Sequence, residues 1–129
     1  MLKRLDHIGV VVDNLDDAAR LLTGMGMELQ EELEVPGRLK VAFFRCGTVE
    51  MEVLQIYDER EREARLGNAT ARLEHVAIEV DDIGKTVEVL ARLGVQIRPP
   101  GPAPTRKNIS CWTVPETSDG ILYQLIQKV

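Results

Sequence analysis

Two similar stretches of sequence decide the fold of this chain. Residues 5–15 read Leu-Asp-His-Ile-Gly-Val-Val-Val-Asp-Asn-Leu, and residues 73–83 read Leu-Glu-His-Val-Ala-Ile-Glu-Val-Asp-Asp-Ile. Each stretch precedes a segment with helical periodicity, and that segment ends at a glycine followed by a hydrophobic residue. Such self-similarity is the signature of a repeated unit. The chain therefore contains one unit twice, and the two copies are offset by 68 residues, from His7 to His75.

The ends of the two copies also match. Residues 48–55 read Thr-Val-Glu-Met-Glu-Val-Leu-Gln, and residues 120–127 read Gly-Ile-Leu-Tyr-Gln-Leu-Ile-Gln, at an offset of 72. The turn-rich segment 115–119 explains the four additional residues as a longer loop in the second copy. We expect a single domain over residues 1–129, made of a first module at about 1–57, a charged connector at 58–71 and a second module at about 72–129.

Each module is predicted to fold as a βαβββ unit. Apolar alternation marks the strands. An Asp-Asn pair supplies the cap of a helix that begins near Leu15 and ends near Gly24 or Gly26. The connector is expected to be a solvated segment or a short helix, and the proline-rich segment 99–104 a loop. The predicted strands are 5–12, 28–34, 40–45 and 48–55 in the first module and 73–80, 95–98, 108–114 and 120–127 in the second, with a second helix at 83–93.

Composition and charge exclude several classes of function. The chain has 129 residues with 16 Lys and Arg against 21 Asp and Glu, a net charge of −5, which argues against nucleic acid and anionic membranes as partners. It contains no apolar run long enough to span a membrane and no signal peptide, so we expect a cytoplasmic protein. The two cysteines, Cys46 and Cys111, are too few for a disulfide scaffold. Only two histidines are present, which excludes Ser-His-Asp catalysis if both bind a metal.

Alternation along the strands brings out a set of four polar residues. His7 and His75 both lie on the strand face that points away from the predicted helix of their module. Glu52 and Gln124 occupy equivalent positions in the last strands of the two modules. A carboxylate between apolar strand residues is costly to bury unless it is paired or bound to a metal. If the modules pack about a pseudo-twofold axis, these four side chains form a site for a divalent transition metal. The alternative is a polar cleft in which they hydrogen-bond one another.

The doubled βαβββ unit with its two histidine motifs resembles the vicinal oxygen chelate superfamily, which includes glyoxalase I, methylmalonyl-CoA epimerases, extradiol dioxygenases and antibiotic resistance proteins. The segments 40–43 (Lys-Val-Ala-Phe) and 50–54 (Glu-Met-Glu-Val-Leu) and the motif around His75 resemble the epimerases most. The resemblance implies an α+β fold in which the two modules form a curled, incomplete barrel-like mixed sheet with a central cleft and a metal in it. It also implies the same four ligands. Gln124 stands where the epimerases usually have Glu, and Glu52 where they usually have Gln.

The expected function is that of a metal-dependent isomerase or lyase, most like methylmalonyl-CoA epimerase. The metal (Co, Ni, Zn or Mn) would stabilise the enolate that forms when a proton leaves a carbon next to a carbonyl. Glu52 is the predicted base, with Glu50 and Glu79 as second-line candidates on the same strand faces. The predicted substrate-binding residues are Lys40, Gly9 and Ala77, and Arg98, Arg106 and Lys107 are further cations that could hold an acyl-CoA or another anion.

Three other functions remain open at this stage. The chain could be a glyoxalase I-like lyase, which uses related chemistry. Two histidines and one carboxylate also describe the ligands of non-haem iron dioxygenases, although the chain has no third histidine for acid-base chemistry. A protein that sequesters a small molecule such as an antibiotic is the third, and an aromatic content of 4% argues mildly against it. The expected partner is a small-molecule substrate, and the family resemblance favours a homodimer.

Overall fold

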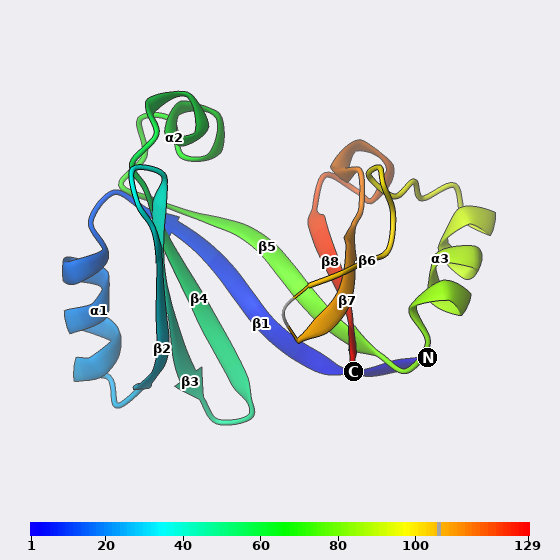
Figure 1. Cartoon of the computed structure of the whole chain (residues 1–129), viewed down its shortest axis with the longest axis horizontal. Helices are drawn as coiled ribbons and strands as arrows, with labels where there is room; N and C mark the ends of the chain where they lie inside the picture. The colour runs from blue at the N-terminus through cyan, green and yellow to red at the C-terminus, as the bar shows by residue number, and fades with distance from the viewer. Residues whose placement is uncertain (106) are drawn as a thin grey trace. The chain divides into compact units, whose positions relative to one another are not determined.

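A computed structural model describes residues 1–105 and 107–129 of the chain (Figure 1). Strands and helices follow one another in the order that the duplication predicts, with one short helix between the two copies. The elements of the first copy and this helix are β1 (Leu2–Val12), α1 (Leu15–Gly24), β2 (Glu28–Val35), β3 (Leu39–Cys46), β4 (Val49–Ile56) and α2 (Glu59–Arg65). Those of the second are β5 (Ala71–Val80), α3 (Ile83–Arg92), β6 (Ala103–Pro104), β7 (Asn108–Trp112), the 3₁₀-helix η1 (Pro115–Thr117) and β8 (Leu122–Lys128).

The strands of the described residues form one eight-stranded sheet in the order β2-β3-β4-β1-β5-β8-β7-β6. The sheet is mixed, because β1 pairs with β4 and β5 with β8 in parallel, whereas β3 and β7 pair with their neighbours antiparallel. It has two ends, β2 and β6, and is therefore not closed into a barrel. This confirms the predicted α+β class with a mixed, open sheet.

The chain divides into two compact units. The N-terminal unit consists of His7–Glu74, and the C-terminal unit consists of Met1–Asp6 together with His75–Val129. The strands β1 and β5 each contribute residues to both units, because the division falls between positions 6 and 7 in β1 and between 74 and 75 in β5. Each unit is described by itself below.

Pairing within the units reproduces the duplication residue by residue. In the N-terminal unit Gly9 lies opposite Glu52, and in the C-terminal unit Ala77 lies opposite Gln124. These positions are related by the two offsets read from the sequence, 68 in the first strand and 72 in the last. The histidine two residues before each small residue therefore has the same relation to the following parallel strand in both units.

The helices α1 and α3 begin with matching hydrogen bonds in the two units. Asn14 caps α1 by accepting a hydrogen bond from the backbone N–H of Asp17, and Asp82 caps α3 through the N–H of Lys85, each at 3.0 Å. A glutamine of the last strand accepts the first N–H of each helix at 2.8 Å, from Leu15 to Gln55 and from Ile83 to Gln127. Gly26 and Gly94 follow the helices with φ of +99° and +86°, a conformation that favours glycine.

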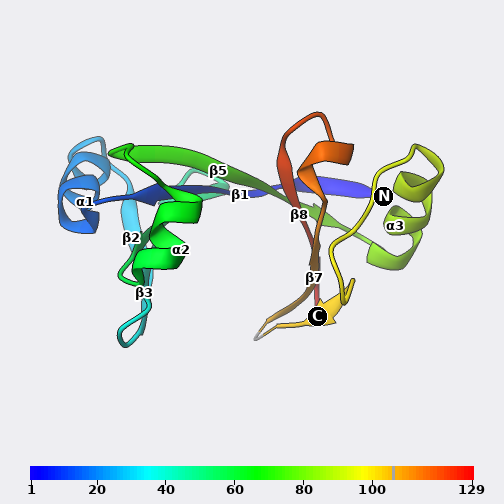
Figure 2. The ribbon, with the colours of Figure 1, turned by 90° about the horizontal axis from the view of Figure 1, so that it is seen from above.

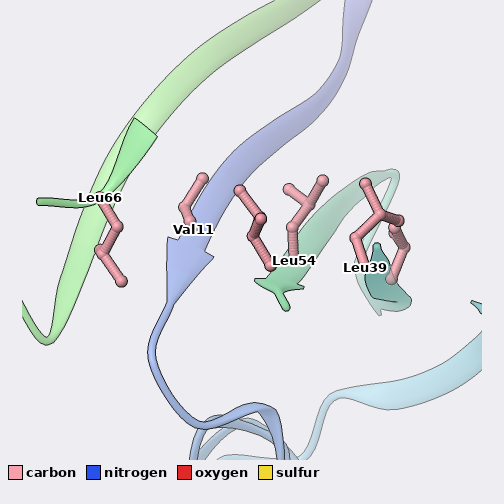
Figure 3. Packing of buried hydrophobic residues seen from close by; sticks show 6 residues of the cluster. Val11, Leu39, Leu54 and Leu66 are labelled. Carbon is pink, nitrogen blue, oxygen red and sulfur yellow. The ribbon is translucent and has the colours of Figure 1, made fainter. Parts of the chain in front are cut away.

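Apolar side chains fill the space between each helix and the sheet. α1 packs on a cluster that includes Phe44 and Val53, and α3 packs on one that includes Val80 and Leu125. The opposite face of the N-terminal unit carries a second apolar cluster, in which Val11, Leu39 and Leu54 meet Leu66 from the end of α2 (Figure 3). Among the described residues, no helix is both long and apolar enough to span a membrane.

Three local predictions need correction. Residues 95–98 form no strand, and only an isolated bridge joins Ile97 to Thr113. The outer partner of β7 is β6, a two-residue strand within the segment predicted to be a loop. Proline has no N–H to donate, so it is tolerated at such an edge strand. β1 and β5 also begin earlier than predicted, at Leu2 and Ala71. The connector contains a short helix, α2, which is one of the two forms expected for it.

Candidate functional site

His7 and Glu52 come together in the N-terminal unit. The His7 Nε2 atom lies 3.8 Å from Glu52 Oε2, across neighbouring parallel strands. His7 is buried, and the carboxylate side chain is 17% exposed, so the pair borders solvent. Phe43 on β3 presents its ring edge-on to the His7 imidazole, with 6.4 Å between centroids. The alternation of β1 and β4 thus places both side chains on one face, as predicted.

His75 and Gln124 lie at the corresponding positions of the C-terminal unit. His75 is buried, with only 3% of its surface exposed, and Gln124 is half-buried on the neighbouring strand β8. The indole of Trp112 meets the His75 imidazole edge-on at 4.9 Å between centroids. Trp112 pairs with Gln124 in the antiparallel ladder, just as Phe43 pairs with Glu52. Each histidine therefore has a matching aromatic neighbour.

His7 and Glu52 offer two donors that could hold a metal ion within the N-terminal unit, an imidazole nitrogen and a carboxylate oxygen. Divalent transition metals accept both kinds of ligand. The C-terminal unit offers the buried imidazole of His75 at the corresponding position. The donor types of each unit therefore fit the metal that the sequence predicts.

The two second-line acids have different surroundings. Glu50 is half-buried and lies opposite His7 in the pairing of β1 with β4. Glu79 is only 7% exposed, and its carboxylate contacts Lys3 at 3.4 Å and Arg4 at 3.2 Å. These two contacts hold the Glu79 side chain in place, which favours a positioning role over proton transfer.

The predicted substrate-binding residues are dispersed. Lys40 is half-buried on β3, while Gly9 and Ala77 are buried opposite Glu52 and Gln124. Among the further cations, Arg98 and Lys107 are exposed, and Arg106 lies outside the described residues.

The aromatic partners of the histidines are the residues that sequence reasoning missed. Phe43 and Trp112 are 69 residues apart, an offset that differs from both 68 and 72. The signal was present, because aligning the third strand of each module separately pairs Phe43 with Trp112. The changing offset records one inserted residue before this strand and three after it.

Comparison with known proteins identifies the family. The family model described as Glyoxalase/Bleomycin resistance protein/Dioxygenase superfamily matches residues 4–125. The chain belongs to this superfamily. The match covers both units and confirms the resemblance drawn from the histidine motifs. No curated protein matches the chain in sequence.

Solved structures of other proteins share the fold of this chain. A hypothetical protein, BH1468 from Bacillus halodurans C-125, is 25% identical, with a TM-score of 0.82 over 98% of this chain and 94% of its own. Methylmalonyl-CoA epimerase from Mycobacterium tuberculosis is 19% identical, with a TM-score of 0.85 over 99% of this chain and 89% of its own. A variant of the Streptomyces coelicolor epimerase in complex with 2-nitronate-propionyl-CoA is 18% identical, with a TM-score of 0.81 over 100% and 99%.

Proposed function

We propose that this superfamily member is a metal-dependent isomerase or lyase that removes a proton from a carbon next to a carbonyl, most like methylmalonyl-CoA epimerase. The observation that carries the proposal is the identical placement of His7 with Glu52 and of His75 with Gln124 in the two units. The likeness to solved epimerases supports it, and one of these is bound to an acyl-CoA analogue.

The proposed ligands of the metal are His7, Glu52, His75 and Gln124. A bound Co, Ni, Zn or Mn ion would supply positive charge to stabilise the negative charge that develops on the substrate oxygen. The buried imidazoles of His7 and His75 are held edge-on by Phe43 and Trp112, which limits their rotation.

Glu52 is the proposed base. Its carboxylate is the partly exposed member of the His7 pair, so a substrate can approach it from solvent. The side-chain amide of Gln124 cannot act as a base, and the Glu79 carboxylate already contacts two cations. The proposal therefore rests on one carboxylate, with Glu50 as the next acid along β4. Lys40, Gly9 and Ala77 remain the proposed substrate contacts, and an acyl-CoA remains the proposed substrate.

A second candidate is a glyoxalase I-like lyase. An epimerase that works with two bases needs an acid on each face of the substrate carbon. A lyase that removes and returns the proton with one carboxylate needs only Glu52. The amide of Gln124 at the position equivalent to Glu52 favours such one-base chemistry.

Exchange of the substrate proton tests the proposal. The protein loaded with each metal in turn is incubated with methylmalonyl-CoA in deuterated water, and deuterium at the α-carbon is measured by mass spectrometry. We expect incorporation by the native chain and a loss of about 100-fold or more in Glu52→Gln. Glu63→Gln in the exposed helix α2 is the matched control and should retain full activity.

Metal content separates the two parts of the proposal. Purified protein should retain about one divalent ion per chain, and His7→Ala should lose it. Absence of metal from the native chain after loading would exclude the isomerase and the lyase together. Metal without exchange would exclude the epimerase reaction, and turnover of a hemithioacetal would then identify the lyase. A homodimer, which we also propose, is measured by sedimentation.

A further inference from the structure

One position under helix α3 breaks the equivalence of the two units. Phe44 on β3 is 1% exposed and is among the largest fully buried side chains of the described residues. It pairs with Met51 in the N-terminal unit. In the C-terminal unit Tyr123 corresponds to Met51, and the residue hydrogen-bonded to Tyr123 is Thr113. A phenyl ring is therefore replaced by a threonine in the middle of the layer between helix and sheet.

The neighbours of this position remain apolar in both units. Val10, Val12 and Leu22 pack around Phe44, and their counterparts Ile78, Val80 and Leu90 lie around Thr113. Val53 on the last strand corresponds in the same way to Leu125. The apolar surroundings of the ring are thus kept in the C-terminal unit while the ring itself is missing.

A pocket of about 640 Å³, larger than one ring, borders this position in the C-terminal unit. This volume lies within the 300–1,000 Å³ typical of small-molecule sites. Ile78, Val80 and Leu125 line its sheet side, Leu90 its helix side, and the exposed side chains of Leu2 and Leu93 lie at its edge. Figures 1 and 2 both show the start of β1 beside α3, where this edge lies.

The polar groups of the lining indicate what the pocket accepts. The Thr113 and Ser118 hydroxyls hydrogen-bond each other, and Ser118 also donates to the carbonyl of Ile121 at 2.7 Å. These groups are satisfied within the chain and require nothing from a ligand. The lining contains no Lys or Arg side chain among the described residues, and its one carboxylate is that of Asp119. Met1 also lines the pocket, but its ammonium is already paired with Asp81 at 2.7 Å. The charge of the lining therefore disfavours an anionic head group.

We propose that this pocket is a second binding site, which takes an aliphatic chain with an uncharged or cationic head. Ile78 and Val80 point to the helix side of β5, whereas His75 and Ala77 lie on the other face of the strand. The pocket is therefore separate from the proposed metal ligands. The aliphatic chain fills the volume that Phe44 fills in the N-terminal unit, and the head lies at the edge near Asp119.

Titration of the methyl resonances with short alcohols tests the site. Protein labelled at Ile, Leu and Val methyl groups is titrated with 1-butanol, 1-hexanol and 1-octanol, and dissociation constants are read from shifts of Ile78 and Leu90. Affinity should rise about fourfold for each added methylene. Octylamine should bind at least as well as 1-octanol, and octanoate at least tenfold more weakly. Octanoate binding as tightly as 1-octanol overturns the proposed head group.

Two substitutions probe the origin of the pocket. Thr113→Phe restores the ring of the other unit and should weaken 1-octanol binding at least tenfold while raising the melting temperature. Leu93→Lys, at a side chain that is 73% exposed, should leave the fold intact and bring octanoate affinity to that of 1-octanol. Unchanged 1-octanol binding in Thr113→Phe, or shifts outside the lining residues, would show that the alcohol binds elsewhere. Deuterium incorporation at the α-carbon of methylmalonyl-CoA is measured in parallel and should not respond to Leu93→Lys.

Discussion

The two units use the same face of their strands in opposite ways. In the N-terminal unit this face carries Val11, Leu39, Val41, Leu54 and Ile56, which pack together with Leu66 (Figure 3). The register of the strands gives the counterparts of the five strand residues in the C-terminal unit, which are Glu79, Asn108, Ser110, Ile126 and Lys128. Four of the five positions have changed from apolar to polar while the backbone pairing has stayed the same.

The polar face has its own internal pairing. Glu79 contacts Lys3 and Arg4, and Lys128 reaches Asp6 at 3.1 Å. The Asn108 Oδ1 atom is buried and accepts no hydrogen bond. Buried polar groups without full partners lower stability. The strand register is therefore the same in both units. The face is apolar and stabilises the N-terminal unit, whereas in the C-terminal unit it is polar and also carries His75.

The largest effect is expected where the apolar face is given the residue of its counterpart. Val11→Glu places a carboxylate at a side chain that is 0% exposed and has only apolar neighbours in its cluster. The free energy of unfolding should fall by about 4 kcal/mol. Glu79→Val, the reverse change, should lower it by no more than about 1 kcal/mol, because Lys3 and Arg4 remain solvated. Urea denaturation measures both, and equal losses would contradict the contrast.

A smaller effect is expected at the ion pair that joins α2 to β5. Arg65 donates to both oxygens of Glu74 at 2.7 Å, and these hydrogen bonds with the Glu74 charge raise the pKa of Arg65. Arg65→Met leaves the Glu74 carboxylate, which is 10% exposed, without this partner and should cost about 2 kcal/mol of unfolding free energy. Arg38→Met removes an exposed pair with Glu61 and should cost less than about 0.5 kcal/mol. The unfolding free energies of the two variants are compared at low and at high salt.

The two helix caps should respond equally, since Asn14 and Asp82 make the same hydrogen bond at 3.0 Å. Asn14→Ala and Asp82→Ala each remove one hydrogen bond to a backbone N–H at the first turn. Each should lower the unfolding free energy by about 1 kcal/mol. Thermal unfolding of the two variants side by side checks this. A difference larger than about 1 kcal/mol would mean that the two helices are anchored unequally.

The two cysteines allow the units to be compared by chemical labelling, without any substitution. Cys111 occupies the position equivalent to Ala42, and burial raises the pKa of its thiol from 9.0 to about 11. Cys46 is exposed at the end of β3. Since the thiolate is the reactive form, a disulfide reagent at pH 8 should modify Cys46 at least about 100-fold faster. Mass spectrometry of the labelled peptides gives the ratio, and full reaction at both sites is expected only in denaturant.

Much of the fold could be predicted from the sequence because the repeat aligns its strands and helices. The helices α1 and α3 begin at the predicted residues, Leu15 and Ile83. The apolar alternation of residues 95–98 predicts a strand that does not form, because alternation carries no information on a pairing partner. The backbone hydrogen bonds of this segment depend on the tertiary fold. The N–H of Arg98, for example, donates to the carbonyl of Trp112, outside any regular pairing of strands. The proline-rich β6 then takes the edge that an ordinary strand would occupy.

The face that carries the candidate site could be predicted from strand alternation, but its electrostatics could not. Because the sequence places the start of the first strand at residue 5, it leaves Lys3 and Arg4 outside the sheet. β1 in fact begins at Leu2, so both cations reach Glu79, a residue 75 positions or more away along the chain. A contact of this kind depends on the order of the strands in the sheet. The hydrophobic periodicity of the sequence does not determine that order. The same holds for the ring contacts of His7 with Phe43 and of His75 with Trp112.

The division of β1 between the two units has a consequence for synthesis on the ribosome. Residues 1–6 are made first, yet they belong to a unit that is completed only by the last strand, β8. The N-terminal unit is continuous from His7 to Glu74, so it can fold as soon as that stretch has emerged. Residues 1–6 then stay solvated until the second copy of the repeat has been translated. A nascent chain whose residues 1–80 have emerged from the ribosome should therefore carry a folded N-terminal unit with residues 1–6 unpaired.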